Sequence, residues 1–468
     1  MYQVPHYIDN NKVFIVQRSE IEGRLEPEFY RPSIADLEKI IRGKSSHKLR
    51  DYALSVSGGA TPKKTEGDKY YADKETGVPF LRVQNLNTDG TLSFDDCLYI
   101  NKETHEGMLA RSQVSEGDLL VKITGVGRMA IASVAPEGFI GNTNQHMVVV
   151  KTGNKEISKY LARYLNLDII EKIASRHSTG GTRPALDYPS VKNLPIIEGI
   201  DFSPIDRAIE IKKQKESEAQ QLLDSIDAYI LNELGVTLPE IKTDLKSRMF
   251  LVNRSELEER LDPTVYKDGT KLISSLFENV KLSHVAFVNP GGAYKGKPIG
   301  TSISFIPMEA IDEVYSGISS QGETTIADSS GFTKFKEGDL LWAKITPCMQ
   351  NGKSAIARDL TNGLGCGSTE FFVLRPKDER LSVEYLHVIL HMKCVRETAM
   401  LYFGGSAGQQ RVSSSFLENF NLPLPALAKQ QEIANHINAI RQQAKQLQEE
   451  GKSILENAKK EVEQMIIG

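Results

Sequence analysis

The amino-acid sequence predicts an α/β protein of two tandem domains joined by long helices. At 468 residues the chain is longer than one hydrophobic core usually serves, so two or more domains are expected. A 17-residue stretch at 14–30 returns at 250–266 with ten identical positions. Two further segments carry apolar residues at the spacing of long helices. Together these features indicate a duplicated domain with helical joints.

The repeat extends well beyond that stretch. "EGDLLVKIT" at 116–124 returns as "EGDLLWAKIT" at 337–346, which we align with one inserted residue. "STGGTRPALDYPSVKNLPI" at 178–196 is answered by "GGSAGQQRVSSSFLENFNLPLP" at 404–425. The blocks keep the same order in both halves, which indicates duplication rather than chance. The predicted limits are two domains, 1–202 and 237–425, each followed by a helical region, 203–236 and 426–468.

The two helical regions carry matched apolar stripes. The first begins at Ser203-Pro204-Ile205-Asp206, with a capping hydroxyl, a proline at the first helical position and an acid at the third. An apolar residue about every 3.5 positions suits a helix that winds against one partner helix. One such helix alone could instead lie on its own domain, but two matched stripes favour pairing with each other. Lys212 and Glu216 would then be polar positions that set the register or select the partner. The predicted seam comprises Ile205, Ile209, Leu223, Ile226, Ile230, Ile433, Ile437, Ile440, Leu447 and Ile454.

Within the first repeat the periodicity is mixed. Residues 157–177 carry apolar side chains at helical spacing, and we expect one helix there. β-branched residues bounded by Gly, Asn and Asp predict strands. The expected strand segments are "LRVQNL" (81–86), "DLLVKIT" (118–124), "MAIASVA" (129–135) and "HMVVVKT" (146–152).

Composition is that of an ordinary globular protein, with 40% hydrophobic and 25% charged residues. We see no leader and no apolar run of 18 residues, so we expect a cytoplasmic chain without a membrane partner. The four cysteines form no C-x-x-C pair, which favours reduced thiols over disulfides or a zinc site. The net charge of −4 means that any DNA binding would need local basic patches.

Motifs of catalysis are weak in this sequence. "GVGRMA" at 125–130 lacks the third glycine of a dinucleotide loop, and "VNPGGAY" at 288–294 only faintly resembles the Asn-Pro-Pro-aromatic motif of adenine methyltransferases. Turns are the simpler interpretation of both. His387 and His391 have a metal-ligand spacing, but their neighbours are apolar and no H-E-x-x-H glutamate is present. We therefore predict no catalytic residue and no metal site in this chain.

Donor-rich loops recur at corresponding places in both halves. Lys and Arg can hold phosphates, and Arg, Gln and Asn can make bidentate contacts to base edges. Any one of these residues could instead lie in a solvated turn, but the matched positions favour a DNA-binding role. The candidates in the first repeat are Lys63, Lys64, Lys122, Thr124, Arg128, Thr179, Thr182 and Arg183. Those in the second are Lys295, Lys297, Lys344, Thr346, Gln350, Asn351, Gln409, Gln410 and Arg411.

The pattern resembles the specificity (S) subunits of type I DNA restriction–modification systems. The resemblance covers nearly the whole chain and includes the "GGATPKK" loop (58–64), "GDLLVKIT" and "GDLLWAKIT". "NLPLPALAKQQEIANHI" (421–437) is similar to the family's Pro-Leu-Pro-Pro-Leu-x-x-Gln-Gln start of a conserved helix, with Ala426 in place of one proline. The first copy keeps a proline but lacks the Gln-Gln pair.

The resemblance implies a non-catalytic chain that binds double-stranded DNA. Each repeat would be a target recognition domain for one half of a split DNA sequence, and the helices would form an antiparallel coiled coil that fixes the spacer. Two methyltransferase (M) subunits would dock on the chain and hold S-adenosylmethionine, and restriction translocase–nuclease (R) subunits would join them in a bacterial or archaeal cell. Two rivals remain, a self-contained methyltransferase or nuclease with fused recognition domains and a coiled-coil scaffold that binds no DNA.

The repeated stretch at 14–30 and 250–266 has a different interpretation from the loops. Parts that read different half-sites should differ between the copies, whereas parts that dock a common partner or frame should match. We therefore expect framework or subunit-docking roles for its shared residues. These are Arg18, Arg24, Leu25, Pro27 and Tyr30 in the first copy, and Arg254, Arg260, Leu261, Pro263 and Tyr266 in the second.

Overall fold

The chain divides by its internal contacts into two compact units. The first comprises residues 1–214 and 450–468, and the second comprises residues 215–449. Both divisions fall inside long helices, so each unit contains a piece of both. The computed structural model describes residues 8–238, 250–254, 262–267, 271–405 and 409–468, apart from the side chains of Lys64, Asp68 and Lys267.

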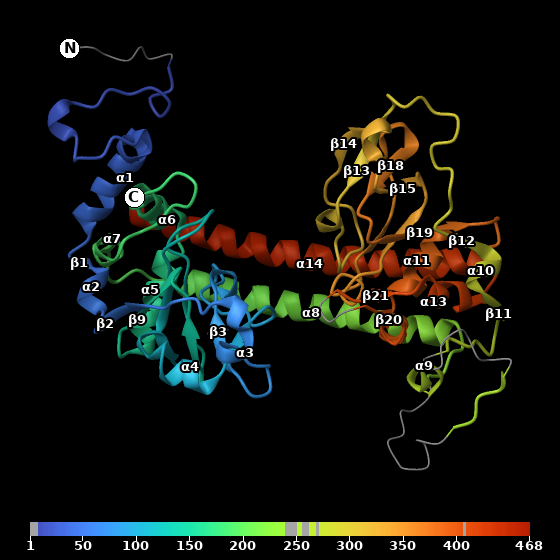
Figure 1. Cartoon of the computed structure of the whole chain (residues 1–468). Coiled ribbons are helices and arrows are strands. Elements are labelled where there is room, and N and C mark those ends of the chain that lie inside the picture. Colours follow the sequence, from blue (N-terminus) through green and yellow to red (C-terminus); the bar gives the residue numbers. More distant parts are fainter. Residues whose placement is uncertain (1–7, 239–249, 255–261, 268–270, 406–408) are drawn as a thin grey trace. The chain divides into compact units, whose positions relative to one another are not determined.

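Two four-stranded sheets form the centre of the first unit (Figure 1). One has the strand order β2-β9-β6-β7 with antiparallel neighbours throughout, and the other has the order β4-β3-β8-β5 with a parallel β3–β8 pair. A short β1–β10 pair completes the strands. Their bounds are β1 His47–Lys48, β2 Ser55–Gly58, β3 Val78–Leu81, β4 Leu98–Ile100, β5 Gln113–Ser115, β6 Leu119–Lys122, β7 Ala132–Val134, β8 Ile140–Thr143, β9 Met147–Lys151 and β10 Pro195–Ile196.

The first sheet is covered on both faces, which explains its continuous apolar runs. Leu119 and Val121 of β6 pack with helix residues such as Leu161 and Ile170. Leu120, between them, packs with residues of the second sheet. The helices of this unit are α1 Pro32–Lys44, α2 Leu49–Tyr52, α3 Gly67–Tyr70, α4 Lys102–Glu106, α5 Lys155–Leu165, α6 Asp168–His177 and α7 Tyr188–Lys192.

Two local predictions were wrong. The helix expected over 157–177 is two helices, α5 and α6, broken at Asn166. The Asn166 side chain donates to the Ala132 carbonyl at 2.7 Å and accepts from its N–H at 3.2 Å, which fixes the break against β7. In "LRVQNL" only Leu81 belongs to a strand, because residues 83–85 form a 3-10 turn. There the Asn85 side chain accepts from the Arg82 N–H at 2.7 Å.

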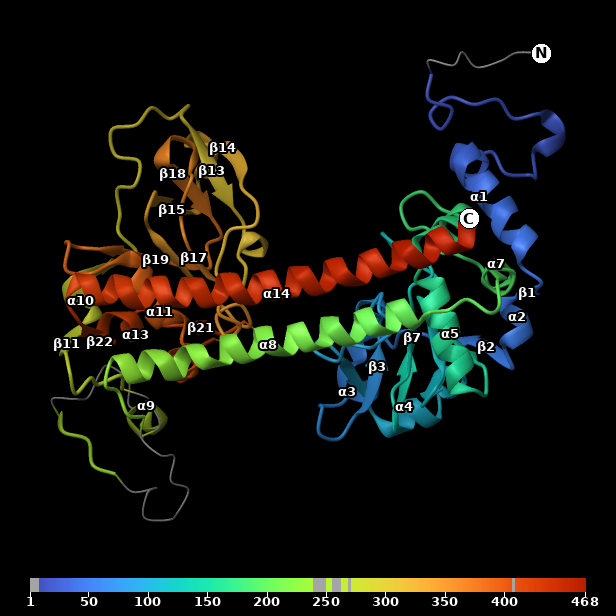
Figure 2. The ribbon, with the colours of Figure 1, turned by 180° about the vertical axis from the view of Figure 1, so that it is seen from behind.

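The second unit repeats this strand order (Figure 2). Its sheets are β12-β19-β16-β17 and β14-β13-β18-β15, with an antiparallel β11–β22 pair and a short β20–β21 pair. The strands are β11 Glu278–Lys281, β12 Ala286–Val288, β13 Ser302–Ile306, β14 Gly322–Thr325, β15 Thr333–Lys336, β16 Leu340–Ala343, β17 Ser354–Ile356, β18 Leu364–Gly367, β19 Phe371–Pro376, β20 Phe403–Gly404, β21 Arg411–Val412 and β22 Asn421–Leu424. The helices are α9 Pro263–Lys267, α10 Leu282–Val285, α11 Val383–His391, α12 Lys393–Met400 and α13 Ser414–Asn419. The mixed α/β class predicted from the sequence is confirmed.

Two long helices, α8 (Ser203–Glu233) and α14 (Leu427–Ile467), contribute to both units. In the second unit they run in opposite directions, with Lys429 Nζ 2.5 Å from Glu233 Oε2 and the Tyr229 and His436 ring centres 4.1 Å apart. In the first unit a Cβ added at Gly451 would lie 3.3 Å from the Lys212 Cα, so glycine lets the two backbones approach closely there.

The start of α14 is fixed by a buried amide. Gln430 is fully buried, and its Nε2 donates to the carbonyls of Arg380 at 2.7 Å and Pro425 at 2.8 Å. Its Oε1 accepts from the Ser382 N–H at 2.8 Å. This explains physically why a glutamine follows the proline-rich turn. Among the described residues, no helix combines the length and apolarity needed to cross a bilayer.

Candidate nucleic-acid interface

In the first unit two predicted DNA-binding loops are hydrogen-bonded to each other. The loop after β6 (124–128) meets the loop after α6 (178–185) at one end of the first sheet. Gly125 N–H donates to the Pro184 carbonyl at 3.0 Å, and the Leu186 N–H donates to the Ile123 carbonyl at 2.8 Å. The sequence separates these loops by about fifty residues, but the fold makes them one surface element.

The connection between β8 and β9 adds a third loop at this end. The His146 carbonyl accepts from the Ile123 N–H at 2.9 Å. A Cβ at Gly59 would lie 1.7 Å from the Thr143 carbonyl oxygen, so only glycine fits where the 58–64 loop passes this connection. Thr61 also hydrogen-bonds Gln145.

The predicted residues of these loops differ in accessibility. Lys63, Thr179, Thr182 and Arg183 are exposed, and Thr124 is half-buried. Lys122 is only 3% exposed, and its ammonium donates to the Val126 carbonyl at 2.8 Å, within its own turn. Burial lowers the pKa of Lys122. This lysine holds the loop in shape in the structure, and the side chain of Lys64 lies outside the described part.

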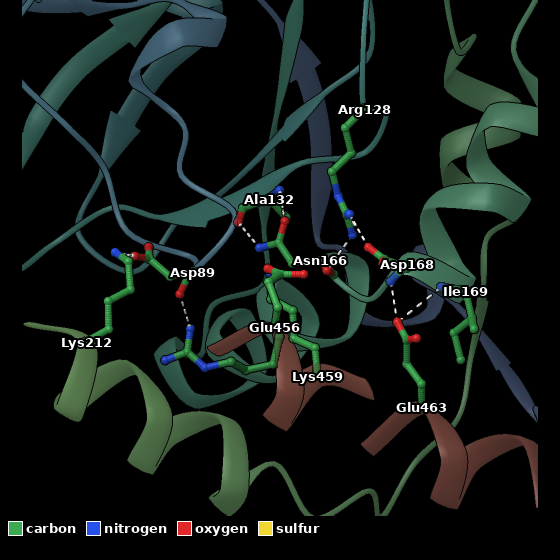
Figure 3. Close-up of polar contacts among 11 residues, drawn as sticks. Asp89, Arg128, Ala132, Asn166, Asp168, Ile169, Lys212, Glu456, Lys459 and Glu463 are labelled. Carbon is green, nitrogen blue, oxygen red and sulfur yellow. Dashed lines mark hydrogen bonds and ion pairs between the residues drawn. The ribbon is translucent and has the colours of Figure 1, made fainter. Parts of the chain in front are cut away.

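Arg128 faces inward, as Figure 3 shows. Its guanidinium pairs with Asp168, the first residue of α6, and donates to the Asn166 carbonyl at 2.5 Å. Glu463 of α14 accepts from the Asp168 N–H and, at 3.3 Å, from the Ile169 N–H. A carboxylate at a helix N-terminus is favourable because four N–H groups there have no partner in the helix. Arg128 therefore ties the loop to the α5–α6 junction and, through it, to the end of α14.

The second unit joins its corresponding loops in the same way. Thr346 N–H donates to the Gln410 carbonyl at 3.0 Å, and the Val412 N–H donates to the Lys344 carbonyl at 2.9 Å. The β18–β19 connection again lies beside them, since the Lys344 N–H donates to the Glu370 carbonyl at 2.9 Å.

The predicted residues of the second unit also fall into two groups. Lys295, Lys297, Asn351, Gln409 and Arg411 are exposed, whereas Lys344, Thr346, Gln350 and Gln410 are half-buried. The Lys344 ammonium lies 5.5 Å from the Phe372 ring centre. Asn351 Nδ2 donates to Glu313 Oε2 at 3.3 Å, and the Gln350 carbonyl accepts from Arg396.

Arg411 and Arg183 have different neighbours at equivalent places. Arg411 forms a two-nitrogen ion pair with Glu370, with Nε–Oε2 at 2.9 Å and Nη2–Oε1 at 2.8 Å. The hydrogen bonds from Arg411 lower the pKa of Glu370. In the first unit the corresponding residue is His146, whose pKa is lowered by burial and by the charge of Arg183. Sequence reasoning missed His146 and Glu370. They follow "GNTNQ" and "GCGST" immediately before matched strands, which was the available signal.

The sequence alignment placed one inserted residue in the "EGDLLWAKIT" block. The strand registers show that residues 119–122 match residues 340–343 without an insertion. Lys122 pairs with Met147 across the β6–β9 ladder, whereas Ala343 occupies that position opposite Phe371 in β16–β19. Lys344 therefore corresponds to Ile123. Because side chains alternate between sheet faces, Lys122 and Lys344 point to opposite sides and are not equivalent.

The first copy of the repeated stretch reaches the same loops. Arg24 Nη2 donates to the Ser178 carbonyl at 2.7 Å, and the guanidinium carbons of Arg24 and Arg176 lie 4.6 Å and 4.4 Å from the Phe29 ring centre. Residues of this cluster line a cavity of about 520 Å³ together with Gly127 and Gly180. Tyr30 supports the turn by donating to the Arg24 carbonyl at 2.8 Å, while Leu25 is 82% exposed. Arg260 and Leu261 of the second copy lie outside the described residues.

The predicted seam residues are mostly buried in the two domain cores. Ile205 and Ile209 pack with α5, α6 and the end of α14 in the first unit, and Ile230 packs with Ile433 and Ile437 in the second. Ile440 is buried, and Leu223, Ile226, Leu447 and Ile454 are half-buried. Lys212, expected to set the helix register, lies 2.8 Å from Asp89 Oδ2 in the first domain (Figure 3).

The described residues contain no group of three or more His, Cys, Asp or Glu side chains that could hold a metal ion. His387 is buried, with Nε2 3.1 Å from Ser354 Oγ, and His391 Nε2 donates to the Glu313 carbonyl at 3.2 Å. The two rings are 6.2 Å apart and nearly perpendicular, so they pack as core side chains.

Parts of this chain are similar in sequence to known proteins. Residues 275–456 match the family described as "Type I restriction modification DNA specificity domain". The chain is 32% identical over 197 residues to the type I restriction enzyme EcoEI specificity subunit of Escherichia coli and 31% identical over 212 residues to the EcoAI specificity subunit of the same organism. The matches cover 41% and 45% of this chain but only 32% and 34% of those relatives, about a third of their length.

A solved structure described as "Structural basis underlying complex assembly and conformational transition of the type I R-M system" contains a chain with 17% identity and a TM-score of 0.44. It covers 90% of this chain and 95% of that one. The sequence matches confirm the resemblance seen in the repeats and the "NLPLP" helix start. The chain carries a type I restriction modification DNA specificity domain over residues 275–456, and it is similar in sequence to specificity subunits of type I restriction enzymes.

Proposed function

We propose that this chain is the non-catalytic DNA-recognition subunit of a type I restriction–modification complex. Each unit would read one half of a split target in double-stranded DNA. The observation that carries the proposal is the joining of donor-rich loops at the same end of the same sheet in both units. In the first unit the Gly125–Pro184 bond joins them, and in the second the Thr346–Gln410 bond does.

Differences between the joined loops support an asymmetric target. The first surface presents Thr179, Thr182 and Arg183, and the second presents Gln409 and Arg411. The acidic Glu370 lies beside Arg411, whereas His146 lies at that place in the first unit. An Arg held by a carboxylate keeps donors for a base edge in a fixed direction, and such bidentate contacts carry sequence specificity.

The helices would form an antiparallel coiled coil that sets the unread spacer. The opposite directions of α8 and α14 in the second unit and the close approach at Gly451 in the first support this pairing. The domain limits 1–202, 203–236, 237–425 and 426–468 belong to the same proposal. A 31-residue and a 41-residue helix would span about 45 Å and 60 Å, more than one turn of duplex.

The catalytic steps would be carried out by partner subunits. Two M subunits would dock on the chain, hold S-adenosylmethionine and methylate adenines, and R subunits would join them for cleavage. The shared stretch that includes Arg24 would serve as framework or docking surface, because both repeats need the same support.

The experiment is a map of methylated adenines in cells that express the chain with its M subunit, compared with cells that lack this chain. We expect methylation at one asymmetric split sequence, lost when the chain is absent. Methylation that persists without it, or DNA binding with no sequence preference when M is present, would contradict the proposal. Methyl transfer from labelled S-adenosylmethionine by the purified chain alone would favour the self-contained enzyme. Failure to shift any DNA, with or without M, would favour the scaffold.

A further inference from the structure

A second polar site lies in the second unit, away from the joined loops. A cavity of about 310 Å³ opens between the turn at 315–318, the end of β17, and the helices α11 and α14. Its lining includes Tyr315, Ser316, His387 and Arg441. The volume is at the lower end of the range for small-molecule sites.

Arg441 is a buried cation without an ion-pair partner among the described residues. It lies on α14 and is 5% exposed. In the described part of the chain Arg441 forms no ion pair, and its Nε has no hydrogen-bond partner. Burial lowers the pKa of Arg441 to about 10, with Asp227 and Asp312 opposing that shift from a distance. The side chain therefore stays charged, and a buried charge without a counter-ion is unfavourable.

Two hydroxyl groups in the same lining also lack partners. Tyr315 Oη and Ser316 Oγ are buried and make no hydrogen bond in the described part of the chain. With Arg441 Nε they make three of the six buried side-chain polar atoms found in that condition. Buried polar atoms in folded proteins usually have a hydrogen-bond partner, so the gathering of three such atoms in one cavity makes the cavity a candidate binding site.

The cavity lining holds two cations, Arg358 and Arg441, and two carboxylates, Asp359 and Glu384. Arg358 is paired with Glu384, and Gln321 Nε2 donates to the Arg358 carbonyl at 3.0 Å. His387 is uncharged near neutral pH, because burial and then the charge of Arg441 lower its pKa to about 3. The carboxylates of Asp359 and Glu384 also line the cavity and would repel a doubly charged phosphate. Water could satisfy the hydroxyl groups but would not neutralise Arg441.

We propose that this cavity binds a small carboxylate ligand, with the carboxylate on the Arg441 guanidinium and with hydrogen bonds from Tyr315 Oη and Ser316 Oγ. Guanidinium and carboxylate match in geometry, and the two hydroxyls supply the further donors that a buried carboxylate needs. The proposal does not depend on DNA recognition, since none of these residues belongs to the joined loops.

The test is calorimetric titration of the full chain with acetate, succinate, inorganic phosphate and chloride at matched ionic strength. Variants Arg441→Met and Tyr315→Phe are compared with Lys445→Met, an exposed residue one turn along α14. We expect the singly charged acetate to bind more tightly than the doubly charged succinate and phosphate, and more tightly than chloride. Arg441→Met should weaken carboxylate binding more than about tenfold, Tyr315→Phe several-fold, and Lys445→Met not at all.

A stability measurement without ligand separates a binding role from a structural one. Arg441→Met should raise the thermal midpoint of the ligand-free chain, because it removes a buried uncompensated charge. If that variant does not fold, a structural role for Arg441 is shown and the proposal fails. The proposal is overturned if Arg441→Met binds carboxylates as well as the wild type does, or if the wild type binds no carboxylate or binds phosphate more tightly. A crystal structure grown in acetate that shows only water in the cavity would overturn it as well.

Discussion

Lys212 of α8 places its ammonium 2.8 Å from the Asp89 carboxylate in the loop that follows β3. The Asp89 side chain is 6% exposed and that of Lys212 is 17% exposed, so water screens the pair poorly. Burial alone would raise the pKa of Asp89, but the hydrogen bonds and charge of its neighbours, Lys212 first, lower it. A residue of the long helix thus neutralises an acid inside the first domain.

We expect Lys212→Met to destabilise the first unit by about 3 kcal/mol, because it leaves Asp89 buried without its cation. Asp89→Asn in the same chain should restore much of the loss, with a coupling energy of about 1–3 kcal/mol in a double-mutant cycle. Urea unfolding followed by circular dichroism measures both quantities. Lys213→Met, at an exposed neighbouring position, is the control. Simple additivity of the two changes would show that the ion pair contributes nothing.

The buried carboxylate of Glu38 should make the stability of the first unit depend on pH. This carboxylate is 3% exposed and bonds His177 at 2.8 Å and Arg42 at 2.7 Å. Burial would raise its pKa, but His177, Arg176 and Arg42 together lower it from 4.5 to about 2. A lowered folded-state pKa stabilises the fold above the unfolded-state value, so this contribution is complete above about pH 4.5 and lost as the pH falls towards 2.

The wild-type chain should therefore lose about 3 kcal/mol of unfolding free energy over that interval through Glu38. Glu38→Gln should be less stable at pH 6 and should approach the wild type as the pH falls. Urea unfolding at a series of pH values gives the difference between the two proteins, and Glu20→Gln, at an exposed site, is the matched control. A difference that stays constant from pH 6 to pH 3 would show that the charge of Glu38 is not responsible.

Glu463, near the end of α14, caps the N-terminus of α6. Its carboxylate accepts N–H groups at the start of α6, where Leu167 offers no capping side chain. Glu463→Ala should cost about 1 kcal/mol, the usual loss for a helix cap, and Glu463→Gln should cost less because an amide oxygen still accepts. Hydrogen exchange of the α6 amides should be fastest in Glu463→Ala, slower in Glu463→Gln and slowest in the wild type. Glu461→Ala, exposed on the same helix, should change neither quantity. Unchanged exchange in Glu463→Ala would refute the capping role.

The sequence alone predicted an α/β fold, because β-branched segments such as 118–124 and 146–152 signal strands, and it predicted the duplication from blocks that recur in the same order. It could not predict the break at Asn166. That break depends on two hydrogen bonds to Ala132, 34 residues earlier, and no local propensity contains them. The loops were selected by residue type, whereas their joining depends on long-range backbone pairing.

The same limit applies to single candidates within the loops. Arg128 and Lys122 look like phosphate ligands in the sequence, but their charges are used for Asp168 and for the Val126 carbonyl. Residue type alone did not single out Glu463 and Glu370, because the partners that give them a role are far away along the chain. Residue type predicts what a side chain can bind, and the fold decides which partner it meets.

The two exposed arginines of the joined loops provide the last prediction. Under the proposed function, Arg183→Ala should relax sequence preference in one half of the target, and Arg411→Ala in the other half. A lost bidentate base contact should weaken discrimination by about 1–3 kcal/mol, or roughly tenfold to a hundredfold at that position. The methylated-adenine map of cells carrying each variant with its M subunit measures the change.

Glu370→Gln supplies a sharper comparison in the second unit. It keeps the shape beside Arg411 but removes the charge that holds the guanidinium in place, so we expect the change in preference to fall in the same half-site as that of Arg411→Ala. Arg207→Ala, exposed on α8, should leave the map unchanged. If either arginine variant lowers methylation equally at all positions, the arginine contacts phosphate rather than a base, because phosphate contacts carry no sequence information. If Arg183→Ala and Arg411→Ala relax the same half-site, the assignment of one half-site to each unit is wrong.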